Sequence, residues 1–481
     1  MVRVRRLLAT ASAVLALAGC AAAPAAASHA QLTFFEAGRL ILEPRHQAST
    51  FAQLRSLGVK ALRLELPWAD VAPAPSSAHT PRFDASDPAA YDWGSYAAVV
   101  ARAKALGWPV LLTITSPAPR WATSNRRAPY ITRPSDADFR RFMTAVGREF
   151  SGSVSLFSIW NEPNHPAFLL PQFSANGAPA SPAIYRGLWE AGYDGLLASG
   201  IKHPRVLFGE TAPVGYDSVS PRREGVLHAV APLAFLRSAF CLDARYRRAG
   251  SCSELHIAGF ADHPYTKAVG PSWVPPQQDD VTIGSLSRLS AALDRAAAAR
   301  AIPAGVPIYL TEYGVQSYPN RLLGVPVATQ ALYDAVAERI AWDNPRVAAF
   351  SQYLLEDDPL GGPPGASARG GTVGFQTGLE YHDGAHKPLY EGWRLPLTVT
   401  PRGGGYALWG LVRPAKGATT ATVLARATAG SRFQVIAHVR TDAAGYWTLH
   451  TTTPYAQWRV RWRNPAGQSF EGPPISAYAG G

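Results

Sequence analysis

Short apolar runs alternate with longer amphipathic segments between residues 31 and 395. Most runs are continuous stretches rich in Val, Ile, Leu, Phe and Tyr, as expected for parallel strands buried on both faces. They cover residues 31–37, 61–66, 109–115, 154–161, 205–210, 255–263, 307–311 and 347–354. Helical patterns lie between them, over residues 47–57, 92–106, 135–150, 183–198, 283–299 and 327–342, and Gly58 and Gly107 follow the first two as stop signals.

Eight strands, each followed by a helical or connecting segment, predict an α/β fold, a (β/α)8 TIM barrel over residues 30–395. An open doubly wound sheet is the alternative, but it needs a glycine-rich phosphate loop after the first strand. The sequence there, Phe34-Phe35-Glu36-Ala37-Gly38, does not supply one. Extended loops at 73–88, 166–182 and 361–374 follow predicted strands, which places them at the active-site end of a barrel.

The composition changes after Trp393, where Pro396, Pro401 and three consecutive glycines mark a boundary. Strand-like runs follow at 406–411, 421–427, 432–440, 446–451 and 457–463. This spacing predicts a small all-β sandwich of the Ig or fibronectin type over residues 396–481. Such a domain binds carbohydrate, acts as a spacer or caps the barrel. Its tryptophans, which serve either binding or packing, are Trp409, Trp447, Trp458 and Trp462.

Residues 1–29 have the features of an export leader. Three arginines precede an apolar stretch at 7–18, which is too short to span a bilayer. Leu17-Ala18-Gly19-Cys20 resembles a lipobox and makes Cys20 a lipidation candidate, whereas the small residues at 21–28 offer ordinary signal-peptidase sites. Both routes predict an extracellular protein, either secreted or lipid-anchored at the cell surface. No later segment reaches 18 uninterrupted apolar residues.

The other two cysteines, Cys241 and Cys252, form an even pair once Cys20 is lipidated or removed. In an oxidising compartment we expect a disulfide that closes the polar loop between them, and two buried free thiols are the alternative. No nearby base or metal-ligand spacing makes either cysteine catalytic.

Composition and charge limit the classes of partner. The 481 residues are 47% hydrophobic and 17% charged, which permits a large core and argues against global disorder. The formal charge is +12, and loss of the three leader arginines lowers it to +9. Because the basic residues are scattered, we expect no nucleic-acid partner. We expect a monomer, with membrane contact only through a lipid at Cys20.

The most specific motif is Ile159-Trp160-Asn161-Glu162-Pro163-Asn164, at the carboxyl end of the fourth predicted strand. An aromatic residue and an amide precede the acid, and a proline stops the strand. A partly apolar wall would raise the pKa of the Glu162 carboxyl and keep it protonated for general-acid catalysis. The alternative is a capped strand end with a solvated glutamate.

A second motif, Tyr309-Leu310-Thr311-Glu312-Tyr313-Gly314, ends the seventh predicted strand. On its own, Glu312 also fits a structural ion pair. However, strands four and seven lie on nearly opposite sides of a barrel mouth, where two carboxylates face each other across a bound sugar. A separation of roughly 5–5.5 Å indicates retention of configuration, and roughly 6.5–9.5 Å indicates inversion.

Together the two motifs resemble the glycoside hydrolases of clan A, particularly families 5 and 39, which are retaining glycosidases on TIM barrels. The resemblance covers the barrel. It implies that Glu162 is the acid/base and Glu312 the nucleophile of a double displacement. It also implies that Asn161 hydrogen-bonds the sugar 2-hydroxyl, an interaction that strengthens in the transition state.

Further positions fit this resemblance. Arg63, in Leu62-Arg63-Leu64-Glu65, matches a strand-two arginine that hydrogen-bonds the nucleophile and lowers its pKa. Its alternative is an ion pair with Glu65 at the barrel bottom. Asp262-His263-Pro264-Tyr265 resembles the clan's His-x-Tyr, in which His263 would line the sugar site and Tyr265 would orient Glu312. A purely structural histidine is the alternative.

Aromatic residues near the predicted mouth suit stacking on pyranose rings, and each also fits ordinary core packing: Trp68, Trp121, Trp160, Trp273 and Tyr313. At the end of strand eight, where many clan A members have a tryptophan, this chain has Gln352 and Tyr353. We expect Gln352 to contact substrate. The acidic run Glu356-Asp357-Asp358 follows strand eight, and its expected ligands are sugar hydroxyls or a cation. Glu210 is a third acid near the mouth, and a catalytic role is the alternative for it.

These features predict a retaining glycoside hydrolase that cleaves O-glycosidic bonds of a β-linked oligo- or polysaccharide without a cofactor. No histidine pair has metal-binding spacing, so no catalytic metal is expected. The alternatives are a catalytically inactive carbohydrate-binding surface protein on the same barrel and another barrel enzyme, such as a polysaccharide lyase or a transglycosidase.

Overall fold

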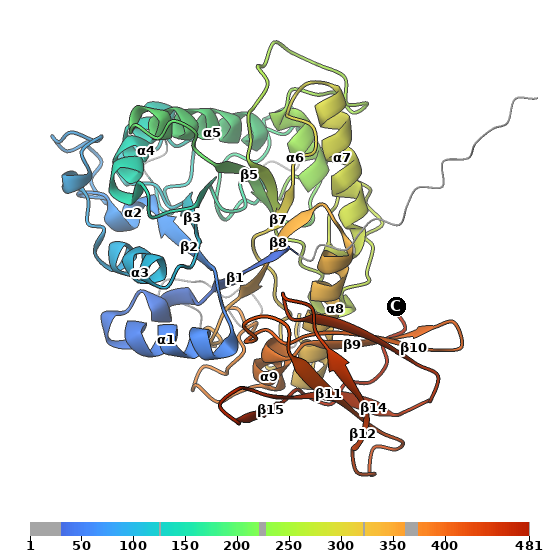
Figure 1. Ribbon diagram of the computed structural model, residues 1–481. Helices are drawn as coiled ribbons and strands as arrows, with labels where there is room; N and C mark the ends of the chain where they lie inside the picture. Colours follow the sequence, from blue (N-terminus) through green and yellow to red (C-terminus); the bar gives the residue numbers. More distant parts are fainter. Residues whose placement is uncertain (1–29, 125–126, 221–227, 321–322, 361–373, 481) are drawn as a thin grey trace, which may run out of the picture.

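A closed parallel barrel forms the larger part of the computed structural model, which describes residues 30–124, 127–220, 228–320, 323–360 and 374–480 (Figure 1). The strands pair in sequence order and β8 pairs with β1. They are β1 Leu32–Glu36, β2 Leu62–Pro67, β3 Val110–Thr115, β4 Leu156–Ile159, β5 Val206–Thr211, β6 Gly259–Asp262, β7 Ile308–Leu310 and β8 Val347–Tyr353. The predicted TIM barrel is therefore confirmed. The leader, including Cys20, lies outside the described residues.

Helices pack around the barrel: α1 Pro44–Leu57, α2 Trp68–Val71, α3 Gly94–Ala105, α4 Asp136–Phe150, α5 Ser181–Ala198, α6 Pro232–Ala239, α7 Leu286–Ala298, α8 Val327–Asp343 and α9 Pro388–Arg394. Gly58 ends α1 in the left-handed region at φ 85°, as its position predicts. The sequence pattern did not reveal α6, because six of its eight residues are buried and it has almost no polar face. None of the helices within the described ranges is long and apolar enough to span a membrane.

The inside of the barrel changes from apolar to polar along the strands. An apolar layer fills one level: Phe34, Ala61, Leu111, Leu156, Leu207, Ala261, Tyr309 and Ala349. Side chains two positions apart on a strand point the same way. The next level therefore holds the polar residues Glu36, Arg63, Thr113, Ser158, His263, Thr311 and Ser351, all buried. This step of two residues brings polar chemistry to the carboxyl ends of the strands, below the mouth.

The C-terminal residues form two antiparallel sheets, in the orders β13-β10-β9 and β12-β11-β14-β15. Their strands are β9 Leu397–Arg402, β10 Gly405–Leu411, β11 Thr420–Arg426, β12 Gln434–Arg440, β13 Tyr446–Thr451, β14 Gln457–Arg463 and β15 Ser469–Glu471. Both sheets contribute to one apolar core, so the predicted sandwich is confirmed. The sequence pattern missed β9 because Pro401 interrupts it, and β9 tolerates this proline as an edge strand.

The four sandwich tryptophans are buried, with at most 4% of their surface exposed. Of the two roles considered for them, packing is therefore the one that the structure supports. Trp447, Trp458 and Trp462 fill the sandwich core, whereas Trp409 packs against Trp342 of α8. They therefore stabilise the sandwich and its contact with the barrel.

The sandwich contacts the barrel beside α8 and α9 (Figure 1). Arg413 is buried there and donates two hydrogen bonds to the carboxylate of Glu338 in α8, at 2.8 and 2.7 Å. Its guanidinium also lies 3.6 Å from the centroid of the Trp393 ring and donates to the Trp393 carbonyl. This buried cation joins the two parts of the chain.

Glu338→Ala leaves the Arg413 charge buried without its carboxylate partner. We expect the free energy of unfolding to fall by about 3–5 kcal/mol, the usual cost of breaking a buried ion pair from one side. Urea unfolding followed by tryptophan fluorescence measures this change. As a control, Glu43→Ala removes an exposed pair with Arg45 and should cost at most about 1 kcal/mol. Equal effects of the two substitutions would contradict the role given to Arg413.

Candidate active site

The chain turns sharply into the barrel mouth after β4. Trp160 and Glu162 both have left-handed backbone angles, φ 68° and 39°, which non-glycine residues adopt at a cost of about 1–3 kcal/mol each. Hydrogen bonds hold the turn: the Trp160 indole N–H donates to the Phe168 carbonyl at 2.9 Å, and the Glu162 N–H donates to the Glu210 carbonyl at 3.0 Å. The turn directs the Glu162 side chain into a cavity.

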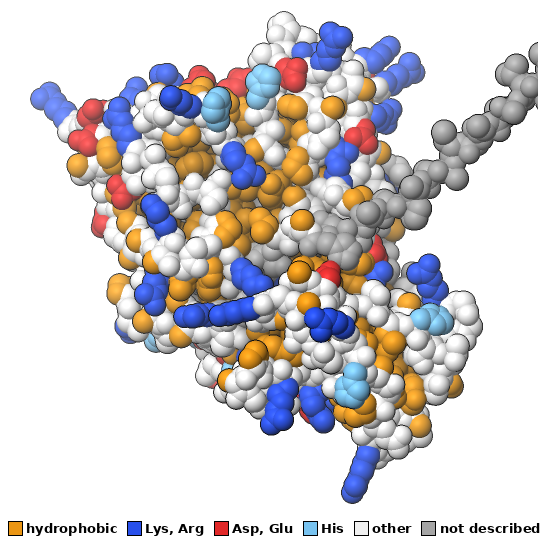
Figure 2. Space-filling model, in the orientation of Figure 1, with side chains coloured by type: hydrophobic (Ala, Val, Ile, Leu, Met, Phe, Trp, Pro, Cys, Tyr) orange, Lys and Arg blue, Asp and Glu red, His pale blue; other side chains and the backbone are white. Residues whose placement is uncertain are grey.

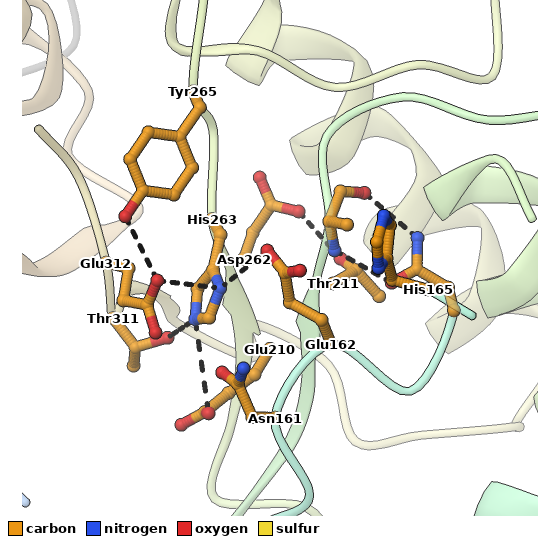
Figure 3. A network of polar contacts seen from close by, with 12 residues as sticks. Asn161, Glu162, His165, Glu210, Thr211, Asp262, His263, Tyr265, Thr311 and Glu312 are labelled. Carbon is orange, nitrogen blue, oxygen red and sulfur yellow. Dashed lines mark hydrogen bonds and ion pairs between the residues drawn. The ribbon is translucent and has the colours of Figure 1, made fainter. Parts of the chain in front are cut away.

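The two predicted acids lie together at the mouth. A carboxylate oxygen of Glu162, one of Glu312 and a ring nitrogen of His263 all lie within 4.8 Å of one another. Figure 3 shows His263 beside both acids, its Nδ1 3.2 Å from Glu162 Oε1 and 3.5 Å from Glu312 Oε2. Within the described part of the chain, these three residues are the one group with the spacing of cation ligands.

Burial controls the protonation of this group. It raises the pKa of Glu162, and the adjacent His263 only partly opposes the shift. It also raises the pKa of Glu312, which the Arg63 guanidinium and a hydrogen bond from the Tyr265 hydroxyl, 3.0 Å from Oε2, both lower. Burial lowers the pKa of His263, so its imidazole is neutral at pH 7. Any charge on these three residues is therefore carried by the carboxyl groups of Glu162 and Glu312.

Arg63 is the centre of the polar layer. Its side chain has no exposed surface and donates to five acceptors. They are Glu312 Oε1 at 2.7 Å, Glu210 Oε2 at 2.8 Å, Asn161 Oδ1 at 3.1 Å, Glu65 Oε1 at 3.2 Å and Glu36. The contact with Glu312 agrees with the expectation from the resemblance. The contact with Glu65 exists as well, but it lies below the mouth and not at the barrel bottom.

Two of these acids were not predicted as site residues. Glu36 lies two positions after Phe34, and Glu65 two positions after Arg63, so strand periodicity alone places both inside the barrel. Burial raises the pKa of Glu65 to about 7 and that of Glu36 well above its usual range. Glu65 lines the cavity beside Glu312. Glu65 therefore exchanges a proton near neutral pH, and burial favours the protonated form of Glu36.

Glu210, the third acid near the predicted mouth, lies beneath it. A register shift between Gly209 and Thr211 and a left-handed φ of 51° turn its side chain into the barrel. There it accepts hydrogen bonds from Arg63 and from Thr113 Oγ1, the latter at 2.8 Å. The side chain is fully buried and does not line the cavity. We therefore interpret Glu210 as a counterion of Arg63.

Three predicted substrate contacts are corrected by their positions. Trp68 is fully buried and stacks on Phe142 of α4, with ring centroids 5.2 Å apart. Trp121 is 3% exposed, packs edge-on against Trp68 and does not line the cavity. Trp68 begins α2 after β2, Trp121 lies in the short 3-10 helix Arg120–Ala122 after β3, and both rings belong to the main apolar core. Gln352 is also buried, and its amide donates to the backbone carbonyls of Tyr353, Leu354 and Thr377.

The acidic run after β8 makes structural contacts. Asp357 accepts hydrogen bonds from Lys387 Nζ at 2.6 Å and from the Gly378 N–H at 2.9 Å. Asp358 accepts one from the N–H of Phe375, whose side chain lines the cavity. This run therefore shapes the rim. The predicted disulfide between Cys241 and Cys252 is confirmed in the loop after α6, with Cα atoms 6.1 Å apart.

Both acids open onto a cavity of about 810 Å³. It extends from Glu65, Glu312 and Tyr353 at the ends of β2, β7 and β8 to the connections that follow β4 and β5. Asn161 and Tyr265 line it too, whereas His263 lies buried behind the acids. A cavity of this size lies within the range of small-molecule sites.

Asp262 gives the site a pH-dependent stability. It is fully buried beside the acids, and burial raises its pKa to about 8. The folded protein thus keeps a proton that the unfolded chain releases near pH 4, so stability falls as pH rises from about 4 to about 8. Asp262→Asn removes this term, and its stability relative to wild type should rise between pH 5 and pH 8.5. Urea unfolding at both values tests this, and an unchanged difference between the two proteins would contradict it.

No protein-family model matches this chain. No curated protein matches it either. Among solved structures, a glucosidase from Croceicoccus marinus has a TM-score of 0.51 at 11% identity, covering 89% of this chain and 94% of that one.

Two other solved structures are similar at lower TM-scores. Xylanase 10B from Thermotoga petrophila RKU-1 in complex with xylobiose has a TM-score of 0.43 at 13% identity, over 76% of this chain and 93% of that one. Bacteroides uniformis β-glucuronidase 2 has 0.44 at 11% identity over 93% of this chain, which spans about half (46%) of that protein. The likeness to the glucosidase establishes the fold, which fits the clan A resemblance without singling out families 5 and 39.

Proposed function

We propose that this protein is a retaining glycoside hydrolase acting on β-linked sugars. One observation supports it above all: the carboxylate oxygens of Glu162 and Glu312 come within 4.8 Å of each other at the wall of one cavity. Retaining enzymes separate their carboxyl groups by roughly 5–5.5 Å, whereas inverting enzymes need roughly 6.5–9.5 Å to admit a water. The short separation favours direct attack by a carboxylate.

The surroundings of Glu162 and Glu312 favour different roles, those of general acid and nucleophile. Burial raises the pKa of Glu162, which favours its protonated form, and its nearest titratable partner is an imidazole. In the proposed reaction Glu162 donates a proton to the glycosidic oxygen while Glu312, whose ionised form Arg63 and Tyr265 stabilise, attacks the anomeric carbon. The carbon–oxygen bond breaks and the alcohol leaves. Glu162 then takes a proton from water, whose oxygen displaces Glu312 and releases the sugar.

Asn161 is oriented for a donor role. Its Oδ1 accepts a hydrogen bond from Arg63 at 3.1 Å, which fixes the orientation of the amide and turns Nδ2 away from the guanidinium. Since Asn161 lines the cavity, this N–H group can donate to the 2-hydroxyl of a sugar held between the acids. Such a bond strengthens as charge develops in the transition state.

Three further observations concern the substrate, the location of the protein and its partners. The fold shared with a glucosidase is compatible with a carbohydrate substrate. The Cys241–Cys252 disulfide supports export, since disulfides persist in oxidising compartments. In Figure 2, Lys and Arg side chains are scattered over the face shown without forming one patch, which offers no footprint for a nucleic acid on that face.

Glu312→Ala removes the nucleophile and should lower kcat/KM for aryl β-glycosides by at least about 10³-fold. Sodium azide should restore turnover and yield an α-glycosyl azide, because the small anion attacks from the vacated side. Product analysis by NMR reads the configuration. Glu356→Ala, which removes an acid outside the cavity, serves as the control and should retain activity.

Three outcomes would contradict the proposal in different ways. Full activity of Glu312→Ala would exclude it as the nucleophile. A β-glycosyl azide would exclude double displacement at a β-glycoside. If the wild-type protein binds oligosaccharides but hydrolyses no glycoside, the inactive carbohydrate-binding protein becomes the better interpretation.

A further inference from the structure

We propose that the leaving-group side of the cavity binds an apolar aglycone, an aromatic or alicyclic alcohol, and not a second sugar. This inference rests on the proposed function, because Glu162 as general acid must lie against the oxygen of the leaving group. It goes further by naming the class of substrate: β-glycosides of apolar alcohols.

The positions of the two acids divide the cavity into two sides. The nucleophile must lie below the anomeric carbon and the acid beside the departing oxygen. Residues that follow β4 and β5 lie around Glu162 and face the leaving group. Residues at the ends of β2, β7 and β8 lie around Glu312 and face the sugar.

The two sides differ in chemistry. The sugar side presents Glu65, Gln316 and Tyr353, all able to bond hydroxyl groups, together with the apolar Leu323 and Phe375. The side around Glu162 presents a largely apolar wall, hereafter the aglycone wall: Ala167, Phe168, Ala212, Pro213, Val214, Tyr216 and Ala229. A sugar ring there would lose water from its hydroxyls and find few partners, at a cost of about 1–3 kcal/mol for each unpaired group. An apolar ring has no hydroxyl groups and therefore carries no such desolvation cost.

Polar side chains are a minority of the residues on this side. His165, His228 and Lys267 also line the cavity. Burial and the charge of Lys267 lower the pKa of His165, so its ring is neutral at pH 7. The His228 ring packs against Tyr216, with the two ring centroids 4.5 Å apart, and its Nε2 has no hydrogen-bond partner among the described residues.

Hydrogen bonds fix the aglycone wall in place. Asn164 is fully buried, and its amide donates to the carbonyls of Ala212 and Val230 at 2.9 and 2.8 Å. Its Oδ1 accepts from the Ala212 N–H at 2.8 Å. The Tyr216 N–H donates to the Ala229 carbonyl at 3.0 Å. One side chain thus ties the connections after β4 and β5 together, so the wall is formed before a ligand arrives.

Tyr216 offers accessible aromatic surface at the cavity. It is 48% exposed. Phe168 lies on the same wall, and its carbonyl holds the Trp160 indole next to the acid motif. Two aromatic rings at the mouth of a preformed apolar wall suit a ring-shaped apolar guest.

The test uses the full chain and compares phenol and 2-naphthol, two leaving groups of similar acidity. A panel of 4-nitrophenyl β-glycosides first identifies an accepted sugar, which tests the proposed function alone. The phenyl and 2-naphthyl glycosides of that sugar are then compared with its β-linked disaccharide. We expect kcat/KM for the 2-naphthyl glycoside to exceed that of the phenyl glycoside by about tenfold or more, the scale of small apolar additions in a fitted pocket. The cyclohexyl glycoside of the same sugar, whose leaving alcohol is no more acidic than a sugar hydroxyl, should be hydrolysed faster than the disaccharide.

Substitutions in the aglycone wall test whether its aromatic residues cause the preference for the 2-naphthyl glycoside. Phe168→Ala and Tyr216→Ala should each reduce the ratio of the 2-naphthyl to the phenyl value by about tenfold. Val435→Ala, on the exposed side of the sandwich strand β12, should leave the ratio unchanged. A disaccharide that is hydrolysed faster than the 2-naphthyl glycoside would overturn the inference while leaving the proposed function intact.

A direct binding measurement tests the apolar site even if the protein hydrolyses none of the glycosides. Calorimetry with 2-naphthol should show saturable binding to the wild-type protein and weaker binding to Phe168→Ala. This result would support the apolar site even if the proposed function failed. Binding to neither protein, or equal binding to both, would overturn the inference.

Discussion

The site depends on one buried cation shared by four carboxylates. Arg63 contacts Glu36, Glu65, Glu210 and Glu312, which come from four different strands or strand ends around the barrel. A guanidinium offers five N–H donors in a fixed plane, so it dictates where each acceptor must lie. Because one positive charge cannot offset four negative ones in a dry interior, burial raises the pKa of Glu36 and Glu65 and favours their protonated forms.

This arrangement gives the two central acids different characters although both are buried. Glu312 lies against Arg63 and receives a hydrogen bond from Tyr265, and both contacts favour its ionised form. Glu162 has only a neutral imidazole at comparable distance. Pairs of titratable groups with contrasting surroundings are the usual basis for dividing acid and nucleophile. The proposed roles therefore follow from geometry as well as from the motif resemblance.

Much of this could be predicted from the sequence, and the failures have physical causes. Buried parallel strands leave continuous apolar runs, so the barrel and the acids at two strand ends were found. The inward direction of the Glu210 side chain depends on a β-bulge, which no local sequence pattern predicts. Trp68 and Trp121 were placed at the mouth because sequence position gives the level along the barrel but not the direction of a side chain beyond a strand end. For Glu36, the step of two from the inward-facing Phe34 already indicates an inward side chain.

The aglycone wall connects the proposed specificity with the proposed catalysis. The residues that would accept an apolar alcohol line the same cavity onto which the Glu162 carboxyl opens. A bound apolar ring would exclude water from that carboxyl and favour its protonated form while the glycosidic bond breaks. Departure of the alcohol would then open the same side to water, which the second half of the reaction requires next to the now ionised Glu162. A second sugar would bring its own hydration shell to this place and weaken the first effect. The composition of the wall and the order of the two steps thus favour the same class of substrate.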